Sequence, residues 1–184
     1  MPIIAALVVL VIIVIWWIAT YNRLVALREQ VSNAWSQIDV QLRRRYDLIP
    51  NIIETVKGYA AHERGTMEAV VKARQQAVDL QNGTPEQRQE AENMLSSTLK
   101  SLFAVTEAYP DLKANQNFLM LQEELSGTEG KIAYSRQHYN DVVNVYNATI
   151  LSFPASLVAG GKFTEKKYFE TEEATREVPK VSFS

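Results

Sequence analysis

The sequence predicts an all-α protein: a single N-terminal transmembrane helix continues into a long antiparallel four-helix bundle, followed by an irregular C-terminal tail. Three observations support this prediction. An uninterrupted apolar run opens the chain, apolar residues then recur at helical spacing, and glycines and prolines are few. We therefore divide the chain into an anchor (1–21), a bundle (22–152) and a C-terminal segment (153–184) that begins near the membrane.

The apolar run from Ile3 to Ala19 contains no charge, proline or glycine. As a helix it would be roughly 26 Å long, at the short end of what crosses a hydrocarbon core of about 30 Å. A cleaved signal peptide is the alternative, but it would carry basic residues before the run and a small-residue cleavage site. Neither is present, which favours a retained anchor. The residues expected in the membrane or its interface include Ile3, Leu7, Leu10, Ile13, Trp16 and Trp17.

The first bundle helix is predicted to follow the anchor without a break and to end at about Tyr46. Its apolar residues recur at alternating steps of three and four, as in a bundle seam. These residues are Leu24, Leu27, Val31, Ala34 and Ile38. Because Pro50 disfavours helical geometry at Ile49, we expect a second helix from about Asn51 to Leu80.

The third helix has a strong start signal at Thr84-Pro85-Glu86-Gln87, where Thr84 would be the N-cap and Gln87 would complete a capping box. It should stop before Ala108. The fourth helix has the most regular seam of the chain: Phe118, Leu121, Leu125, Thr128, Ile132, Ser135, Tyr139, Val142 and Tyr146. Short loops between the segments favour an up-down antiparallel bundle.

The segment from Phe153 onward has glycines, prolines and mixed charge, which is typical of irregular chain. In an up-down bundle this segment starts close to the bilayer. It carries too many apolar residues for a solvated tail: Phe153, Leu157, Val158, Phe163, Tyr168 and Phe169. We expect it to pack on the base of the bundle, on the bilayer surface or on a neighbouring subunit.

Composition argues against several classes of function. A net charge of -2 and a pI near 5.8 argue against nucleic-acid binding. The absence of cysteine excludes disulfides and thiolate metal sites. A di-iron bundle site needs Glu three residues before His, but Tyr59 and Ser135 precede His62 and His138 at that spacing. We therefore predict no catalytic residue, no metal and no cofactor.

Three consecutive arginines, Arg43, Arg44 and Arg45, follow the seam of the first helix. On a helix they point about 100° apart and form no single patch. They would lie about 36 Å beyond the anchor, several Debye lengths of about 8 Å from their own bilayer. A partner at the distal end is one interpretation, and ion pairing with nearby acids is the other. The acids expected to pair with one or two of these arginines are Asp39, Asp47 and Glu54.

Two Tyr-Asn pairs, Tyr139-Asn140 and Tyr146-Asn147, are seven residues apart and share one stripe of the fourth helix. In one interpretation the tyrosines fill the seam and the asparagines form hydrogen bonds between helices. In the other, the pairs form a polar layer that fixes the register of the bundle.

Two long blocks of the sequence are distinctive. The first is AWSQIDVQLRRRYDLIPNIIETVKGYAAHE (34–63), which includes Trp35 and Pro50, and the second is YPDLKANQNFLMLQEELSGTEGKIAYSRQHYNDVVNVYN (109–147). Phe153-Pro154 and the YFE motif around Phe169 follow. Together they resemble the LemA family of bacterial membrane proteins over nearly the whole chain. The resemblance implies one transmembrane helix, a helical bundle and no established enzymatic activity. Some members carry a lipoprotein-type cysteine where this chain has Thr20, so lipid attachment does not carry over.

These features predict a membrane-anchored scaffold or adaptor that contacts the bilayer through its first helix and binds another copy or a membrane protein. The alternative is a sensor or enzyme-associated subunit with a polar pocket inside the bundle. Its residues would be Glu129, Arg136, Tyr139 and Asn140. We expect a single-pass protein of the bacterial inner membrane. Arg23 and Arg28 follow the anchor and no basic residue precedes it, which favours a cytoplasmic bundle. The lipoprotein-type relatives favour an exported one.

Overall fold

The computed structural model of the chain describes residues 1–169, and within this range the fold is all-α, without strands. The elements are α1 (Pro2–Tyr59), α2 (Arg64–Asp79), the 3-10 turn η1 (Leu80–Asn82), α3 (Pro85–Thr106), α4 (Pro110–Lys113), α5 (Gln116–Leu151) and α6 (Ala155–Ala159). The predicted fold class is therefore confirmed.

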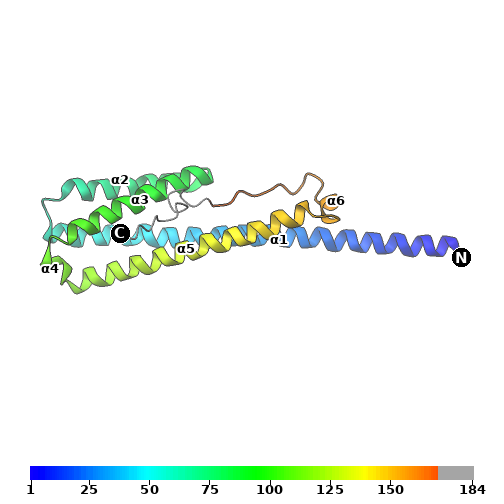
Figure 1. Cartoon of the computed structure of the whole chain (residues 1–184), viewed down its shortest axis with the longest axis horizontal. Helices are drawn as coiled ribbons and strands as arrows, with labels where there is room; N and C mark the ends of the chain where they lie inside the picture. Colours follow the sequence, from blue (N-terminus) through cyan, green and yellow to red (C-terminus); the bar gives the residue numbers. More distant parts are fainter. Residues whose placement is uncertain (170–184) are drawn as a thin grey trace, which may run out of the picture.

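Four helices follow one another in alternating directions, but they differ greatly in length (Figure 1). α1 and α5 pack side by side over a long distance, and α2 packs on α3 as a shorter hairpin. We call the end of the bundle that carries α4 the distal end, and the end that carries α6 the proximal end. The hairpin covers only the distal part of α1 and α5. The chain that follows α6 runs back along the part that the hairpin leaves uncovered (Figure 1).

The first helix does not end near Tyr46 but continues through Pro50 to Tyr59. The predicted break at Pro50 and the predicted start of a second helix at Asn51 are therefore wrong. Pro50 has no N–H to donate to the Tyr46 carbonyl four residues earlier. The Arg74 Nε of α2 donates to this carbonyl instead, at 2.7 Å. Tertiary packing and this replacement hydrogen bond together keep the helix continuous, because the residues that flank the proline are buried. They are Leu48, Ile49, Ile52 and Ile53.

The other expected boundaries are close to those of the structure. Thr84 caps α3: its N–H donates to Gln87 Oε1 at 3.0 Å, and the Gln87 N–H donates to Thr84 Oγ1 at 3.3 Å. The predicted capping box is thus confirmed. The seam of the first helix is buried at all five predicted positions. Leu121 and Val142 of the predicted α5 seam are only partly buried, and Val143, next to Val142, is buried.

The N-terminal part of α1 leaves its apolar side chains exposed. An 18-residue window of this helix has a mean hydropathy of 3.0 and none of it is buried, so α1 is long and apolar enough to cross a membrane. Ile3, Leu7, Leu10 and Ile13 are exposed, as an anchor surrounded by lipid requires. Trp16 differs from them, since it is partly buried against the core.

The C-terminal segment turns back at α6. Gly160 and Gly161 have positive φ values of 42° and 79°, a backbone conformation that glycine adopts without steric cost. Residues 160–169 then run beside α5 without regular secondary structure, and Phe163 and Phe169 are buried. Irregular chain was expected over 153–184, and residues 160–169 agree with this prediction, whereas α6 was not expected. The rest of the predicted segment, 170–184, lies outside the described residues.

Candidate functional site

The two Tyr-Asn pairs of α5 hold the returning tail, and we call these four residues the tail clamp. Asn140 Nδ2 donates to the Phe169 carbonyl at 2.9 Å, and the Phe169 N–H donates to Asn140 Oδ1 at 2.8 Å. Asn147 makes the same pair of bonds with the N–H and the carbonyl of Lys166, both at 2.9 Å. Each asparagine therefore satisfies both backbone groups of one tail residue.

The tyrosines of the clamp contact the tail in the same register. Tyr139 Oη donates to the Lys167 carbonyl at 3.1 Å, and Tyr146 Oη donates to the Thr164 carbonyl at 3.2 Å. Seven residues of helix rise about 10.5 Å, and three residues of extended chain span about 10 Å. Seven positions along α5 thus match three positions along the tail. The seven-residue repeat of Tyr-Asn in the sequence is therefore the spacing at which α5 binds an extended backbone.

This arrangement confirms one part of the first interpretation, the tyrosines in the seam, and differs from both interpretations in what the asparagines bind. The asparagines form hydrogen bonds with tail backbone and not with another helix. The tyrosines belong to the buried seam, as expected, but their hydroxyl groups also point to the tail. All of these hydrogen bonds go to main-chain groups of the tail. The clamp therefore recognises the extended backbone of the tail more than its side chains.

Aromatic packing fixes the tail at Phe169. The ring centroid of Phe169 lies 5.5 Å from that of Trp35 and 6.1 Å from that of Tyr139, and the Arg136 guanidinium lies 4.9 Å from it. The Arg88 guanidinium also lies 4.6 Å from the Trp35 ring centroid. Trp35 and Phe169, both singled out from the sequence, are thus brought together with the clamp.

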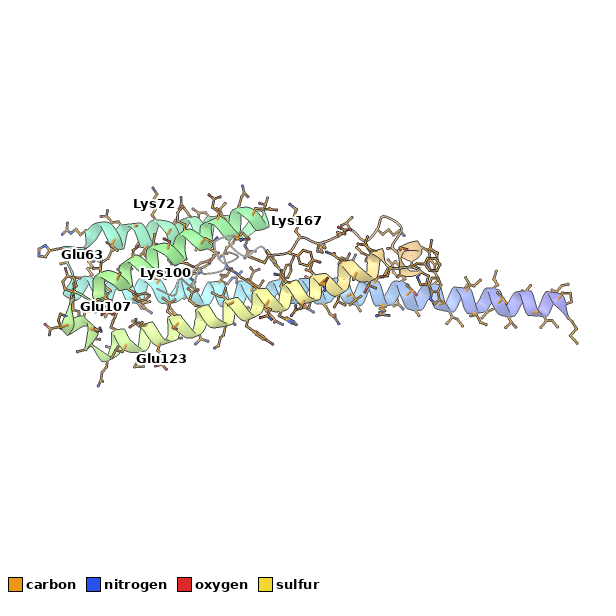
Figure 2. All side chains as sticks on the ribbon, viewed as in Figure 1. Glu63, Lys72, Lys100, Glu107, Glu123 and Lys167 are labelled. Atoms are coloured by element: carbon orange, nitrogen blue, oxygen red, sulfur yellow. The ribbon has the colours of Figure 1, made fainter. Side chains whose placement is uncertain are left out.

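Lys167 joins the tail to the start of α3 (Figure 2). Its Nζ lies 2.6 Å from Glu86 Oε1. The hydrogen bond from Lys167 and those from the Glu86 backbone and from Thr84 hold the pKa of the Glu86 carboxyl down at about 2. The tail therefore bridges α5 and α3 where the α2–α3 hairpin ends.

A buried charge cluster lies further along the bundle, and it is centred on Arg45. This side chain is 1% exposed. Its Nη1 lies 3.1 Å from Glu92 Oε2 and its Nε lies 2.9 Å from Glu129 Oε1, while its Nη2 donates to Ser96 Oγ at 2.8 Å. Tyr46 Oη donates to the second carboxylate oxygen of Glu92. One arginine of α1 thereby ties together α3 and α5.

Burial dominates the electrostatics of this cluster. It raises the pKa of the Tyr46 phenol, and the negative charge of Glu92 raises it further. Burial also lowers the pKa of the Arg136 guanidinium, which lies within the field of Arg45, Glu92 and Glu129. Within residues 1–169, Nε and Nη2 of Arg136 have no hydrogen-bond partner. The cluster brings opposite charges into contact and leaves Tyr46 protonated.

The three consecutive arginines have three different environments. Arg43 is exposed, Arg44 Nη2 lies 2.7 Å from Glu124 Oε1 at the surface, and Arg45 is buried. Their acidic partners lie on α3 and α5, so the expected pairing with nearby acids is wrong. Of those acids, Asp39 pairs with Arg88 and Glu54 with Lys57. Long-range packing decides the partners of Arg44, Arg45 and Asp39, whereas Glu54 and Lys57 are a local pair three residues apart on α1.

Of the four polar residues proposed for a ligand pocket, only Tyr139 lines the cavity that lies nearest to them in the described part of the chain. A cavity of about 360 Å³ borders Tyr139, and it lies between α1 and the tail. Its lining residues are Arg28, Glu29, Val31, Ser32, Trp35, Tyr139 and Lys166. Glu129, Arg136 and Asn140 are not among them. In the described part of the chain, no three His, Asp or Glu side chains lie where they could hold a metal ion together.

An open groove lies at the distal end, between the end of α1 and α2, and we call it the distal groove. Its volume is about 710 Å³. Its lining residues are Lys57, Ala61, Arg64, Met67, Glu68, Val71, Lys72 and Gln75. Lys72 lies on the outer face of α2 (Figure 2). Sequence reasoning did not find this groove, because its residues come from two helices whose boundary was misplaced.

The sequence is similar to those of several known proteins. The chain is 26% identical to Protein LemA of Metamycoplasma hominis over 78% of its own length, and it spans 65% of the length of that protein. It is 25% identical to Magnetosome protein MamQ 2 of Paramagnetospirillum magneticum, covering 94% of this chain and 74% of the relative. It is 23% identical to Magnetosome protein MamQ of Magnetospirillum gryphiswaldense, covering 84% of this chain and 66% of the relative.

The family assignment rests on the bundle and the tail together. A family model matches residues 34–183, which contain the buried charge cluster, the tail clamp and the distal groove. The apolar N-terminal part of α1 precedes the match. With this helix, the chain is a membrane-associated helical protein, and it belongs to the LemA family.

Proposed function

We propose that the protein is a membrane-anchored scaffold or adaptor that binds a partner protein at the distal end of its bundle. The observation that carries this proposal is the continuity of α1. One helix includes both the membrane span and the longest element of the bundle. From Ala19 to Tyr59 it extends about 60 Å, so it holds the distal end at a set distance from the bilayer.

The distal groove supplies a contact surface of defined chemistry. Met67 and Val71 provide its apolar part, and Val71 is 51% exposed. The basic residues around it outnumber the single acidic residue, Glu68; they are Lys57, Arg64 and Lys72. Such a groove fits an amphipathic helix that carries acidic side chains on both sides of its apolar face. We infer that the partner presents a segment of this kind.

The interior of the bundle favours a scaffold over a sensor or an enzyme-associated subunit. Tyr139 and Asn140 are engaged with the tail, and Glu129 is engaged with Arg45. Arg136 packs against Phe169. A ligand at these residues would have to displace contacts that the chain already makes with itself.

A photo-crosslinking experiment in cells tests the proposal. A photoreactive amino acid at Val71 should give one adduct of discrete mass, whose partner peptide carries acidic residues around an apolar face. The substitutions Arg64→Glu and Lys72→Glu should abolish it, whereas Lys131→Glu on α5 should not. A photoreactive residue at Val40, exposed on α1, is the position control.

The mass of the complex in nanodiscs separates the remaining outcomes. A defined multiple of one chain, lost in the same charge-reversal variants, would identify the partner as another copy. A monomeric particle together with equal crosslinking at Val71 and Val40 would contradict the scaffold proposal.

We further propose that the protein is a single-pass protein of the bacterial inner membrane with its bundle in the cytoplasm. Arg23 and Arg28 beside the anchor support this orientation. The chain has no cysteine, so Tyr134→Cys, at an exposed position of α5, creates a unique target for an impermeant thiol reagent. Labelling only after cell lysis is expected. Labelling of intact cells would place the bundle outside.

A further inference from the structure

The corner between α5 and α6 exposes three large apolar side chains, and we call Leu151, Phe153 and Leu157 the proximal apolar corner. Their exposed fractions are 64%, 81% and 59%. The opposite face of α6 is buried through Val158 and Ala159. The corner is therefore amphipathic: one side packs on the bundle, and the other side presents apolar surface outward.

This corner lies at the level where α1 leaves the membrane. The Tyr21 and Phe163 ring centroids are 5.7 Å apart, and α6 contacts α1. Trp16, which belongs to the apolar run, is partly buried against the core cluster that includes Val158 and Phe163. Of the helices other than α1, α6 lies closest to the N-terminal span (Figure 1). The bundle thus overlaps the last turn of the anchor.

The charge pattern at this level matches a membrane interface. No charged residue occurs between Asp141 and Lys162. Trp17 and Tyr21 are exposed at the end of the apolar run on α1, and both residue types favour the region between hydrocarbon and water. The first cations beyond the corner are Arg23 and Arg28 on α1 and Lys162 after α6, and the Arg28 guanidinium lies 5.7 Å from the Phe163 ring centroid. They would meet anionic headgroups.

We propose that the proximal apolar corner inserts into the bilayer interface and forms a second membrane contact beside the anchor. The rotation and tilt of a single helix in a membrane are set only by its own interfacial side chains. A helix with an apolar corner fixed to one side of it has a preferred rotation and tilt. The corner would thereby set the direction in which the bundle faces, and this inference does not depend on the identity of any protein partner.

Spin labelling of the full-length protein in liposomes tests the proposal, because each introduced cysteine is the only one in the chain. For each nitroxide label we define the collision ratio as its collision rate with oxygen divided by its collision rate with a water-soluble nickel chelate. This ratio should be several-fold higher at Phe153→Cys and Leu157→Cys than at the control sites. The controls are Val145→Cys, exposed on α5 less than two turns before Leu151, and Tyr134→Cys further away. Both controls should favour the nickel chelate.

Two results would overturn the proposal. Equal collision ratios at 153, 157 and 134 would place the corner in water. Low collision rates with both reagents at 153 and 157 would mean that protein, such as a second copy, covers it. All labelled positions are exposed, so the variants should fold, and circular dichroism checks that they do.

Discussion

Arg74 Nε donates a hydrogen bond of 2.7 Å to the backbone carbonyl of Tyr46, on a different helix. This carbonyl is the one that Pro50 leaves without a helical partner. The bond therefore has two effects at once. It satisfies a partly buried acceptor in α1, and it attaches α2 to α1 next to the buried charge cluster. A proline inside a helix is tolerated here because another helix supplies the missing donor.

We predict that Arg74→Met lowers the free energy of unfolding by about 1.5–3 kcal/mol, the range for hydrogen bonds to charged donors. In a Pro50→Ala background the loss should be clearly smaller, because the alanine that replaces Pro50 has an N–H that can donate to the Tyr46 carbonyl. Denaturant unfolding of the four proteins, followed by circular dichroism, gives the coupling free energy.

Lys72→Met, at an exposed position of the same helix, is the matched control and should change stability little. If the effects of Arg74→Met and Pro50→Ala simply add, Arg74 does not replace the bond that Pro50 removes.

The helical seams could be predicted from the sequence because apolar residues at steps of three and four have one stable arrangement. The end of the first helix could not, since the residue that decides it, Arg74, is far away in the sequence. The charged residues of the α3 seam could have been predicted to be buried from their spacing. Arg88 and Glu92 precede Leu95, Leu99 and Leu102 at the same alternating steps, and all five are buried.

Only the position of the tail clamp on α5, and not what it binds, could be predicted from the sequence. The seven-residue repeat of Tyr-Asn predicts that the pairs share a stripe of α5, and the structure agrees. What they bind depends on the short α2–α3 hairpin, which leaves part of α1 and α5 uncovered (Figure 1). Hairpin length follows from the position of the helix break, so the error at Pro50 also concealed the space that the tail occupies.

We predict that Glu92→Gln destabilises the protein by about 3 kcal/mol or more, as expected when a buried ion pair is broken. Both carboxylate oxygens of Glu92 accept hydrogen bonds, one from Arg45 and one from Tyr46. A glutamine amide offers only one oxygen, so its NH₂ group would face another donor. Glu90→Gln, exposed on the same helix, should have almost no effect in the same unfolding experiment. Equal effects of both variants would argue against a structural role for the cluster.

Two glycine-to-alanine substitutions should have opposite effects. Gly160 has a φ of 42°, and Gly160→Ala should cost about 1 kcal/mol of stability because alanine is strained there. Gly130 lies within α5 with open space around it, so Gly130→Ala should stabilise by about 0.5–1 kcal/mol. Thermal unfolding measures both changes. A stabilising Gly160→Ala would mean that the turn after α6 differs from the one described.

We predict that each asparagine of the tail clamp protects one specific backbone amide. The Phe169 N–H donates to Asn140, and the Lys166 N–H donates to Asn147. Asn140→Ala removes two hydrogen bonds to Phe169, worth about 2 kcal/mol together. Exchange of the Phe169 amide should therefore be roughly tenfold faster or more, with a smaller effect at Lys166. Asn147→Ala should show the reverse pattern.

Asn144→Ala is the matched control, because Asn144 lies between the two clamp residues on α5 but is exposed. It should leave the exchange of both amides unchanged, as followed by hydrogen exchange and mass spectrometry on short peptides from residues 163–169. If Asn140→Ala and Asn147→Ala each release both amides equally, the tail opens as one unit. The two asparagines would then hold the tail cooperatively and not as two independent contacts. Unchanged exchange in all three variants would contradict the clamp itself.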